Sequence, residues 1–156
     1  MENASQLGRR FREVLLDGKW IANTNFNELL SDLNWQQATQ KVGTLNTIAA
    51  LTFHVNYYVG GVLQVFKGGD LEIRDKYSFD FSPITSQEEW EALRALLMHN
   101  SEEFAREVER LSEDQLEAPF IDEKYGSYRR NIEGMIEHCY YHMGQVSLLK
   151  KMVLGG

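Results

Sequence analysis

Three histidines are the residues of this chain best suited to metal chemistry. His138 and His142 lie four residues apart in IEHCYYHMGQ, and His54 lies in LTFHVNYY. Residues four apart on a helix project from the same face, so His138 and His142 could bind one ion while His54 adds a third nitrogen from a neighbouring helix. Three neutral imidazoles leave coordination positions open, as a catalytic divalent metal requires. The alternative is that these imidazoles are half-buried and bond to carbonyls or carboxylates.

Tyr58 and Gln145 are candidates for a catalytic role because they share the faces of these histidines. Tyr58 follows His54 by four residues. It could hydrogen-bond a ligand or a metal-bound water, although an aromatic residue at this spacing is also typical of a core. Gln145 follows His142 by three residues. It could orient an imidazole, or it could be a polar residue at the end of the helix bundle.

Two other residues with metal-binding side chains are expected to be structural. Cys139 is turned about 100° from His138 around a helix, which is a poor angle for joining the same ion. We therefore expect Cys139 to lie in the core, where a free cysteine behaves as a small apolar residue. His99 has no matching motif around it and is expected to be a surface or structural histidine.

Two arginines at the start of the last expected helix could bind an anionic cofactor or substrate group. Positive side chains such as Arg129 and Arg130 oppose the helix dipole at this position. Together with the N-terminal amides, they could attract an anion such as a substrate carboxylate. The alternative is that Glu133, together with Asp122 or Glu123, neutralises them.

Four long segments with helical periodicity must position these residues. Apolar residues recur at helical spacing in each segment, and the expected helices span about 5–16, 46–67, 86–111 and 127–151. Ser86 and Glu89 are expected to form a capping box at the start of the third helix. Four amphipathic helices in one small domain predict an all-α four-helix bundle.

The connection 68–85 and the glycine pair before it are the unusual parts of this pattern. The connection alternates Tyr77, Phe79 and Phe81 with polar residues. A connection of this length either packs over the domain or forms a lid above a site. Gly60-Gly61 lowers helix propensity, and it could allow a bend or a close packing contact.

Composition limits the function classes. The chain has 156 residues, of which 43% are hydrophobic, and residues 1–156 are expected to form a single domain. The net charge of −7 and the lack of a basic stripe argue against a nucleic-acid partner. We find no signal peptide and no segment of transmembrane length, so no membrane association is expected. The single cysteine fits a reducing compartment, and we expect a cytoplasmic protein.

The order and spacing of these motifs resemble the DinB-like (DinB/YfiT) superfamily of metal-dependent proteins. LNTIAALTFHVNYY carries the histidine of the second long helix, and IEHCYYHMGQVSLLKK is similar to the His-x-x-x-His-x-x-Gln helix of that family. The resemblance covers nearly the whole chain and implies an up-down-down-up four-helix bundle. It also implies that His54, His138 and His142 bind a divalent metal, commonly nickel or zinc. Related bundles often form homodimers, so a homodimer is possible here.

The resemblance does not specify a reaction, because a shared fold and metal site do not determine the chemistry. The superfamily contains thiol-dependent S-transferases such as bacillithiol transferase and mycothiol-dependent maleylpyruvate isomerase. We therefore expect a metal-dependent hydrolase or a low-molecular-weight-thiol S-transferase that acts on a small electrophile. In either case the metal lowers the pKa of a water or of an external thiol. The alternatives are a non-catalytic metal-binding or stress-response bundle, and a self-associating structural bundle without metal.

Overall fold

The computed structural model describes residues 1–155, and this range contains seven α-helices, two 3-10 turns and no β-strand. Four helices are long, and they are α1 (Ala4–Leu15), α4 (Ile48–Phe66), α5 (Gln87–Glu109) and α7 (Tyr128–Gly155). The short elements are α2 (Phe26–Ser31), α3 (Trp35–Ala38), α6 (Glu113–Glu117), η1 (Asp75–Tyr77) and η2 (Glu123–Tyr125). The fold is therefore all-α, as the sequence predicted.

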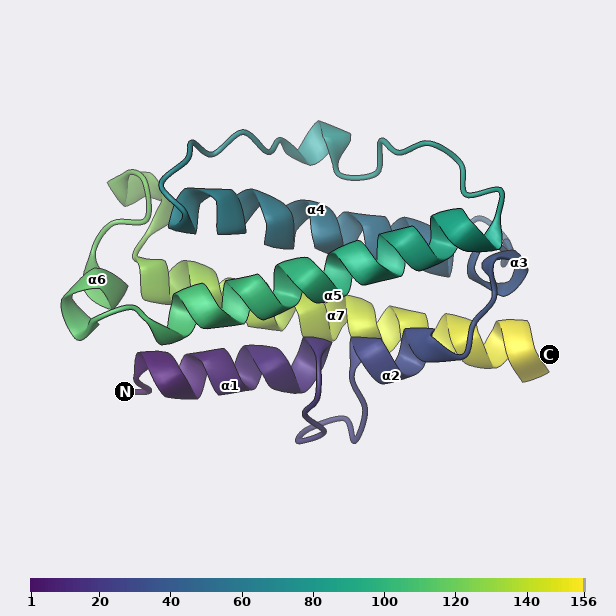
Figure 1. The fold of residues 1–156 in the computed structure, drawn as a ribbon, viewed down its shortest axis with the longest axis horizontal. Helices are drawn as coiled ribbons and strands as arrows, with labels where there is room; N and C mark the ends of the chain where they lie inside the picture. Colours follow the sequence, from purple (N-terminus) through teal and green to yellow (C-terminus); the bar gives the residue numbers. More distant parts are fainter. Residues whose placement is uncertain (156) are drawn as a thin grey trace.

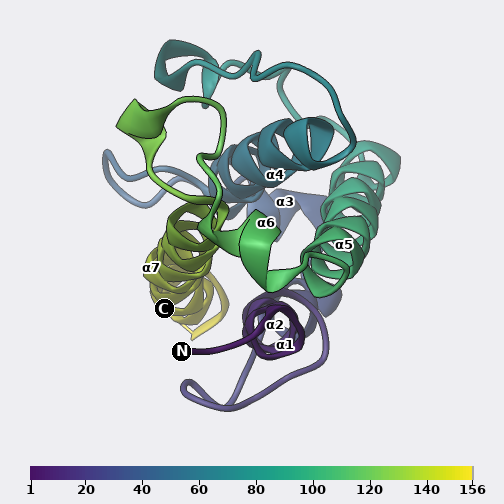
Figure 2. The ribbon, with the colours of Figure 1, turned by 90° about the vertical axis from the view of Figure 1, so that its left-hand side faces the viewer.

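The four long helices lie side by side along the length of the molecule (Figure 1). Helices α1 and α7 run from left to right in that view, and α4 and α5 run in the opposite direction. Each long helix packs against two others, since α5 and α7 both contact α1 and both contact α4 (Figure 2). Among the described residues, no helix combines the length and the apolar character that a membrane span needs.

The first turns of the long helices are capped by side chains. Ser86 Oγ accepts a hydrogen bond from the Glu89 N–H at the start of α5, at 3.1 Å. The expected capping box is wrong in its second half, because the Glu89 carboxylate accepts from the Thr85 N–H at 2.7 Å instead of the Ser86 N–H. At the start of α7, Ser127 Oγ accepts from the Arg130 N–H at 3.1 Å. Such caps pair amide groups that have no partner within the helix.

A single apolar core runs between the long helices, and it includes residues of α2, α3 and α6. Trp90 is fully buried there, and its indole N–H donates to the Leu33 carbonyl at 2.8 Å. Cys139 is also fully buried, as the sequence predicted, and this burial raises the pKa of its thiol. His99 is exposed on α5. Neither Cys139 nor His99 belongs to the histidine cluster.

The glycine pair in α4 makes close contacts within the chain. A Cβ atom at Gly61 would lie 2.2 Å from Cγ2 of Ile73, and one at Gly60 would lie 3.3 Å from Nδ2 of Asn100. Ile73 belongs to the connection between α4 and α5, which passes along the outer side of α4 (Figure 1). Gly61 therefore leaves the space in which this connection packs against α4.

Candidate metal centre

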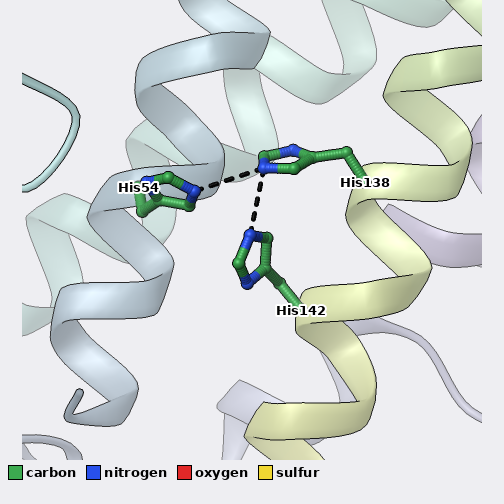
Figure 3. Close-up of side chains that lie close together, drawn as sticks. All are labelled: His54, His138 and His142. Carbon is green, nitrogen blue, oxygen red and sulfur yellow. Dashed lines mark hydrogen bonds between the residues drawn. The ribbon is translucent and has the colours of Figure 1, made fainter. Parts of the chain in front are cut away.

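His54 projects from α4, and His138 and His142 project toward it from one face of α7 (Figure 3). Nε2 of His138 lies 3.2 Å from Nε2 of His54 and 3.0 Å from Nε2 of His142. All three side chains have a ring nitrogen within 4.8 Å of the others. The structure thus brings together the three histidines singled out by the sequence.

Two of the imidazole rings contact an oxygen atom through Nδ1, the nitrogen that points away from the cluster. Nδ1 of His54 lies 3.3 Å from the Ser78 carbonyl oxygen, and Nδ1 of His142 lies 2.7 Å from Oε1 of Gln145. Because these oxygens only accept, both Nδ1 atoms carry the proton, and both Nε2 atoms present a lone pair to the centre of the cluster. Nε2 of His138 can carry only one proton, so it can donate a hydrogen bond to Nε2 of His54 or to Nε2 of His142 but not to both. A cation at the centre would satisfy all three nitrogens.

The spacing of the nitrogens also fits one shared ion. Zinc binds imidazole nitrogen at about 2.0–2.1 Å, so two such nitrogens on a tetrahedral ion lie about 3.3 Å apart. The two separations at His138, 3.2 and 3.0 Å, are close to this value. Three imidazole ligands leave at least one coordination position for another molecule.

Burial keeps the three imidazoles neutral. It lowers the pKa of His138 to about 4, and repulsion from His142 and His54 adds to the effect. Burial is likewise the largest cause of the lowered pKa values of His54 and His142. Neutral imidazole is the form that binds metal, so at neutral pH the cluster does not have to lose protons before it takes up an ion.

Aromatic rings enclose most of the cluster. Phe79 stacks on His54 with ring centroids 4.1 Å apart and an interplanar angle of 8°. The ring of Tyr58 meets His54 and His138 edge-on, at 5.1 Å from each. His54 and His142 are each 7% exposed, whereas His138 is only partly buried. The cluster is therefore most accessible at His138.

The structure places both catalytic candidates beside the cluster. Gln145 contacts His142 as described above. The Tyr58 hydroxyl donates to Oδ1 of Asp75 at 2.5 Å, and burial together with this hydrogen bond raises the pKa of Tyr58 to about 12. The hydroxyl is thus protonated at neutral pH and held by η1.

Sequence reasoning missed Ser78, Phe79 and Asp75 as neighbours of the histidines. The only signal was the alternation of aromatic residues in the connection 68–85. Both interpretations of that connection describe part of what it does, because it packs on the outer side of α4 and also covers His54.

The two arginines at the start of α7 lie in different surroundings. Arg129 is 6% exposed, and it donates to Glu117 at 2.6 Å, to Glu113 at 3.3 Å and to the carbonyl of Glu2. These carboxylates of α6 form its ion pairs, and Glu133, to which the sequence pointed, adds a smaller favourable charge interaction. No ion pair among the described residues joins Arg129 to residue 122 or 123.

Arg130 is exposed and lines a cavity of about 470 Å³. His138 and Tyr58 line the same cavity, which therefore connects this arginine with the histidine cluster. Of the two arginines, Arg130 alone lines this cavity.

Comparison with known proteins agrees with this arrangement. No curated protein and no solved structure gives a significant match to the chain. The family model of the DinB superfamily matches residues 21–146, a range that contains all three histidines and Gln145. Since this match spans most of the sequence, the chain belongs to the DinB superfamily.

Proposed function

We propose that this protein is a metal-dependent enzyme whose divalent ion is held by His54, His138 and His142. The observation that carries the proposal is the convergence of three Nε2 atoms, two of them with lone pairs directed inward by Nδ1–H donation. Nickel and zinc are the ions we propose, because both bind imidazole nitrogen well. Gln145 and the Ser78 carbonyl then act as positioning groups for two of the ligands.

We also propose that residues 1–156 form one domain with the up-down-down-up four-helix bundle of this superfamily. The ribbon supports this, since α1 and α7 run opposite to α4 and α5, and each long helix contacts two others. The single apolar core among the described residues supports one domain. In this bundle, α4 and α7 are the helices that share the ligands.

The reaction we propose is hydrolysis, or transfer of a low-molecular-weight thiol, on a small electrophile. A divalent ion in the cluster supplies Lewis acidity that lowers the pKa of a water or of an external thiol. Substrate approaches from the cavity at His138, since aromatic rings cover the side of His54. Tyr58 lines this cavity next to His138, and while its proton is donated to Asp75, its hydroxyl oxygen can accept a hydrogen bond from a bound water or thiol.

The test is turnover by untagged protein reconstituted with nickel or with zinc. Hydrolysis of p-nitrophenyl acetate and displacement of the chloride of 1-chloro-2,4-dinitrobenzene by the thiol of cysteine represent the two reaction types. His138→Ala is expected to lower the rate at least roughly hundredfold, because even the loss of a group behind a metal ligand costs roughly 10–100-fold. His99→Ala is the matched control, since His99 is exposed on α5 and lies outside the cluster.

Equal rates in the parent, His138→Ala and His99→Ala proteins would contradict a role for the cluster in catalysis. Stoichiometric metal without turnover in either assay would favour the alternative of a non-catalytic metal-binding bundle.

A further inference from the structure

Three residues of α7 connect the start of that helix with the histidine cluster. Arg130, Gly134 and His138 follow one another at intervals of four residues, and all three line the cavity of about 470 Å³. Residues at this spacing lie above one another on one face of a helix. Arg130 and His138 are eight positions apart, which corresponds to about 12 Å along the helix axis. The cavity therefore extends along α7, with a cation near one end and the candidate metal ligand near the other.

Gly134 leaves the middle of this cavity open. A Cβ atom at this position would meet no other atom within 4 Å, apart from its own helical surroundings. Glycine lowers the stability of a helix interior relative to alanine, so local structure does not favour it here. The surrounding walls are mainly apolar, with Val62, Ile73, Phe120 and Met135 among the lining residues. An apolar ligand body thus finds space over Gly134 and apolar contacts at its sides.

Arg130 is the one charged side chain among the residues that line this cavity. None of the ion pairs formed within residues 1–155 includes Arg130. At the other end, the Tyr58 hydroxyl donates to the Asp75 carboxylate. With a net charge of −7, the chain as a whole repels anions. Arg130 therefore gives this end of the cavity a local attraction for anions.

The wall beside Arg130 is held by hydrogen bonds. The Asn131 amide donates to the carbonyls of Tyr125 and Ser127, at 2.8 and 2.9 Å. Gly126 has φ of 77°, a conformation that favours glycine, and a Cβ atom there would lie 3.4 Å from Cγ of Arg130. The connection before α7 thus turns close to the arginine and lines this end of the cavity.

We propose that this cavity binds a small organic anion lengthwise along α7. Its carboxylate contacts Arg130, its apolar body lies over Gly134, and its other end lies at His138. The volume is within the range of about 300–1,000 Å³ that is usual for small-molecule sites. The reactivity of the end at His138 rests on the proposed metal-dependent function, whereas the anion subsite rests on Arg130 and Gly134 alone.

The charge requirement is tested with hexanoate and its neutral counterpart hexanamide. Affinities are measured by NMR titration of untagged protein, before and after chelation with EDTA, because a bound metal would itself attract a carboxylate. Parent protein in the chelated state is expected to bind hexanoate about tenfold more tightly than hexanamide, as a charge-assisted hydrogen bond predicts. Arg130→Gln is expected to remove the preference. Arg94→Gln, which changes an arginine of α5 outside the cavity lining, is expected to keep it.

The shape requirement is tested with a pair of glycine variants in the same helix. Gly134→Leu fills the proposed ligand space and is expected to weaken hexanoate binding at least about tenfold, because overlapping atoms cannot relax away from a packed wall. Gly144→Leu is the matched control, since Gly144 is exposed, has equally open surroundings and lies outside the cavity lining. This control is expected to bind hexanoate like the parent protein.

Equal affinities of chelated parent protein for hexanoate and hexanamide would overturn the proposal. A preference that survives Arg130→Gln, or unchanged binding to Gly134→Leu, would also overturn it. Metal content of the same proteins separates this proposal from the metal site. Protein that takes up no metal but binds hexanoate through Arg130 would refute the metal centre and support the anion subsite.

Discussion

At the residue scale, the geometry of the candidate site depends on the groups that hold the imidazoles. His138, His142 and Gln145 could be predicted from the sequence because their spacing places them on one face of α7, whereas His54 was identified on α4 from the resemblance of its motif. The contact of His54 with the Ser78 carbonyl could not be predicted from the sequence, because it joins residues 24 apart through a connection without regular periodicity. The Tyr58–Asp75 hydrogen bond was missed for the same reason.

Replacing Gln145 tests whether it positions His142. Gln145→Leu removes the acceptor at 2.7 Å from Nδ1 and is expected to weaken metal binding by roughly 10–100-fold, as is usual for groups behind a metal ligand. Gln145→Glu keeps an acceptor and is expected to bind metal at least as tightly as the parent protein. Competition with a chromophoric chelator measures both affinities. Equal affinity of the Leu variant and the parent would show that Gln145 plays no such role.

The lowered histidine pKa values predict how the stability of metal-free protein changes with pH. The unfolded chain binds a proton at His138 near pH 6.5, whereas the folded protein binds it only near pH 4. Stability from this residue is therefore complete above about pH 6.5, and it is lost as the pH falls toward about 4. Urea unfolding of chelated protein across this window should show the decline. It should be shallower in His138→Asn, and equal slopes in the two proteins would contradict the prediction.

At the scale of elements, the connection between α4 and α5 completes the site. Its length and alternating aromatics were visible in the sequence, but its register on α4 was not. That register depends on Ile73 packing at Gly61, a tertiary contact between residues 12 apart. It places Ser78 and Phe79 against His54. A glycine pair in a helix predicts a close packing contact, but it does not predict which segment of the chain makes that contact.

Substitution at Gly61 should therefore loosen this connection. A Cβ atom would lie 2.2 Å from Cγ2 of Ile73, so Gly61→Ala is expected to displace residues 68–85. Hydrogen exchange should become faster in that segment, and metal affinity should fall as the contacts with His54 are lost. Gly144→Ala, which adds a Cβ atom in open surroundings of α7, is the control. Unchanged exchange in Gly61→Ala would show that Ile73 does not fix the connection.

At the scale of the whole molecule, long helices were easier to predict than the elements that join them. Periodicity over many residues identified α1, α4, α5 and α7, and with them the all-α class. Helix α6 has five residues, too few to show a periodic pattern. Its glutamates form the ion pairs with Arg129, so these partners could not be predicted from the sequence, unlike the smaller contribution of Glu133.

Arg129 joins the N-terminal segment, α6 and α7 through hydrogen bonds to Glu2, Glu113 and Glu117. Arg129→Ala is expected to lower the free energy of unfolding by about 1–3 kcal/mol, because hydrogen bonds of a buried charged group are lost. In a chain of this size, each kcal/mol corresponds to about 2–4 °C in Tm. Arg130→Ala is expected to leave Tm unchanged, since this arginine is exposed. Thermal unfolding measures both, and equal effects would contradict the separate roles of the two arginines.

The metal content of untagged protein tests whether the three histidines bind a divalent ion. Inductively coupled plasma mass spectrometry compares the parent with a His54→Ala, His138→Ala, His142→Ala triple variant whose folding is matched by circular dichroism. We expect about one nickel or zinc ion per parent chain and none in the variant, because three converging imidazoles form one site. Parent protein that is empty after purification, and that takes up neither ion on reconstitution, would contradict it.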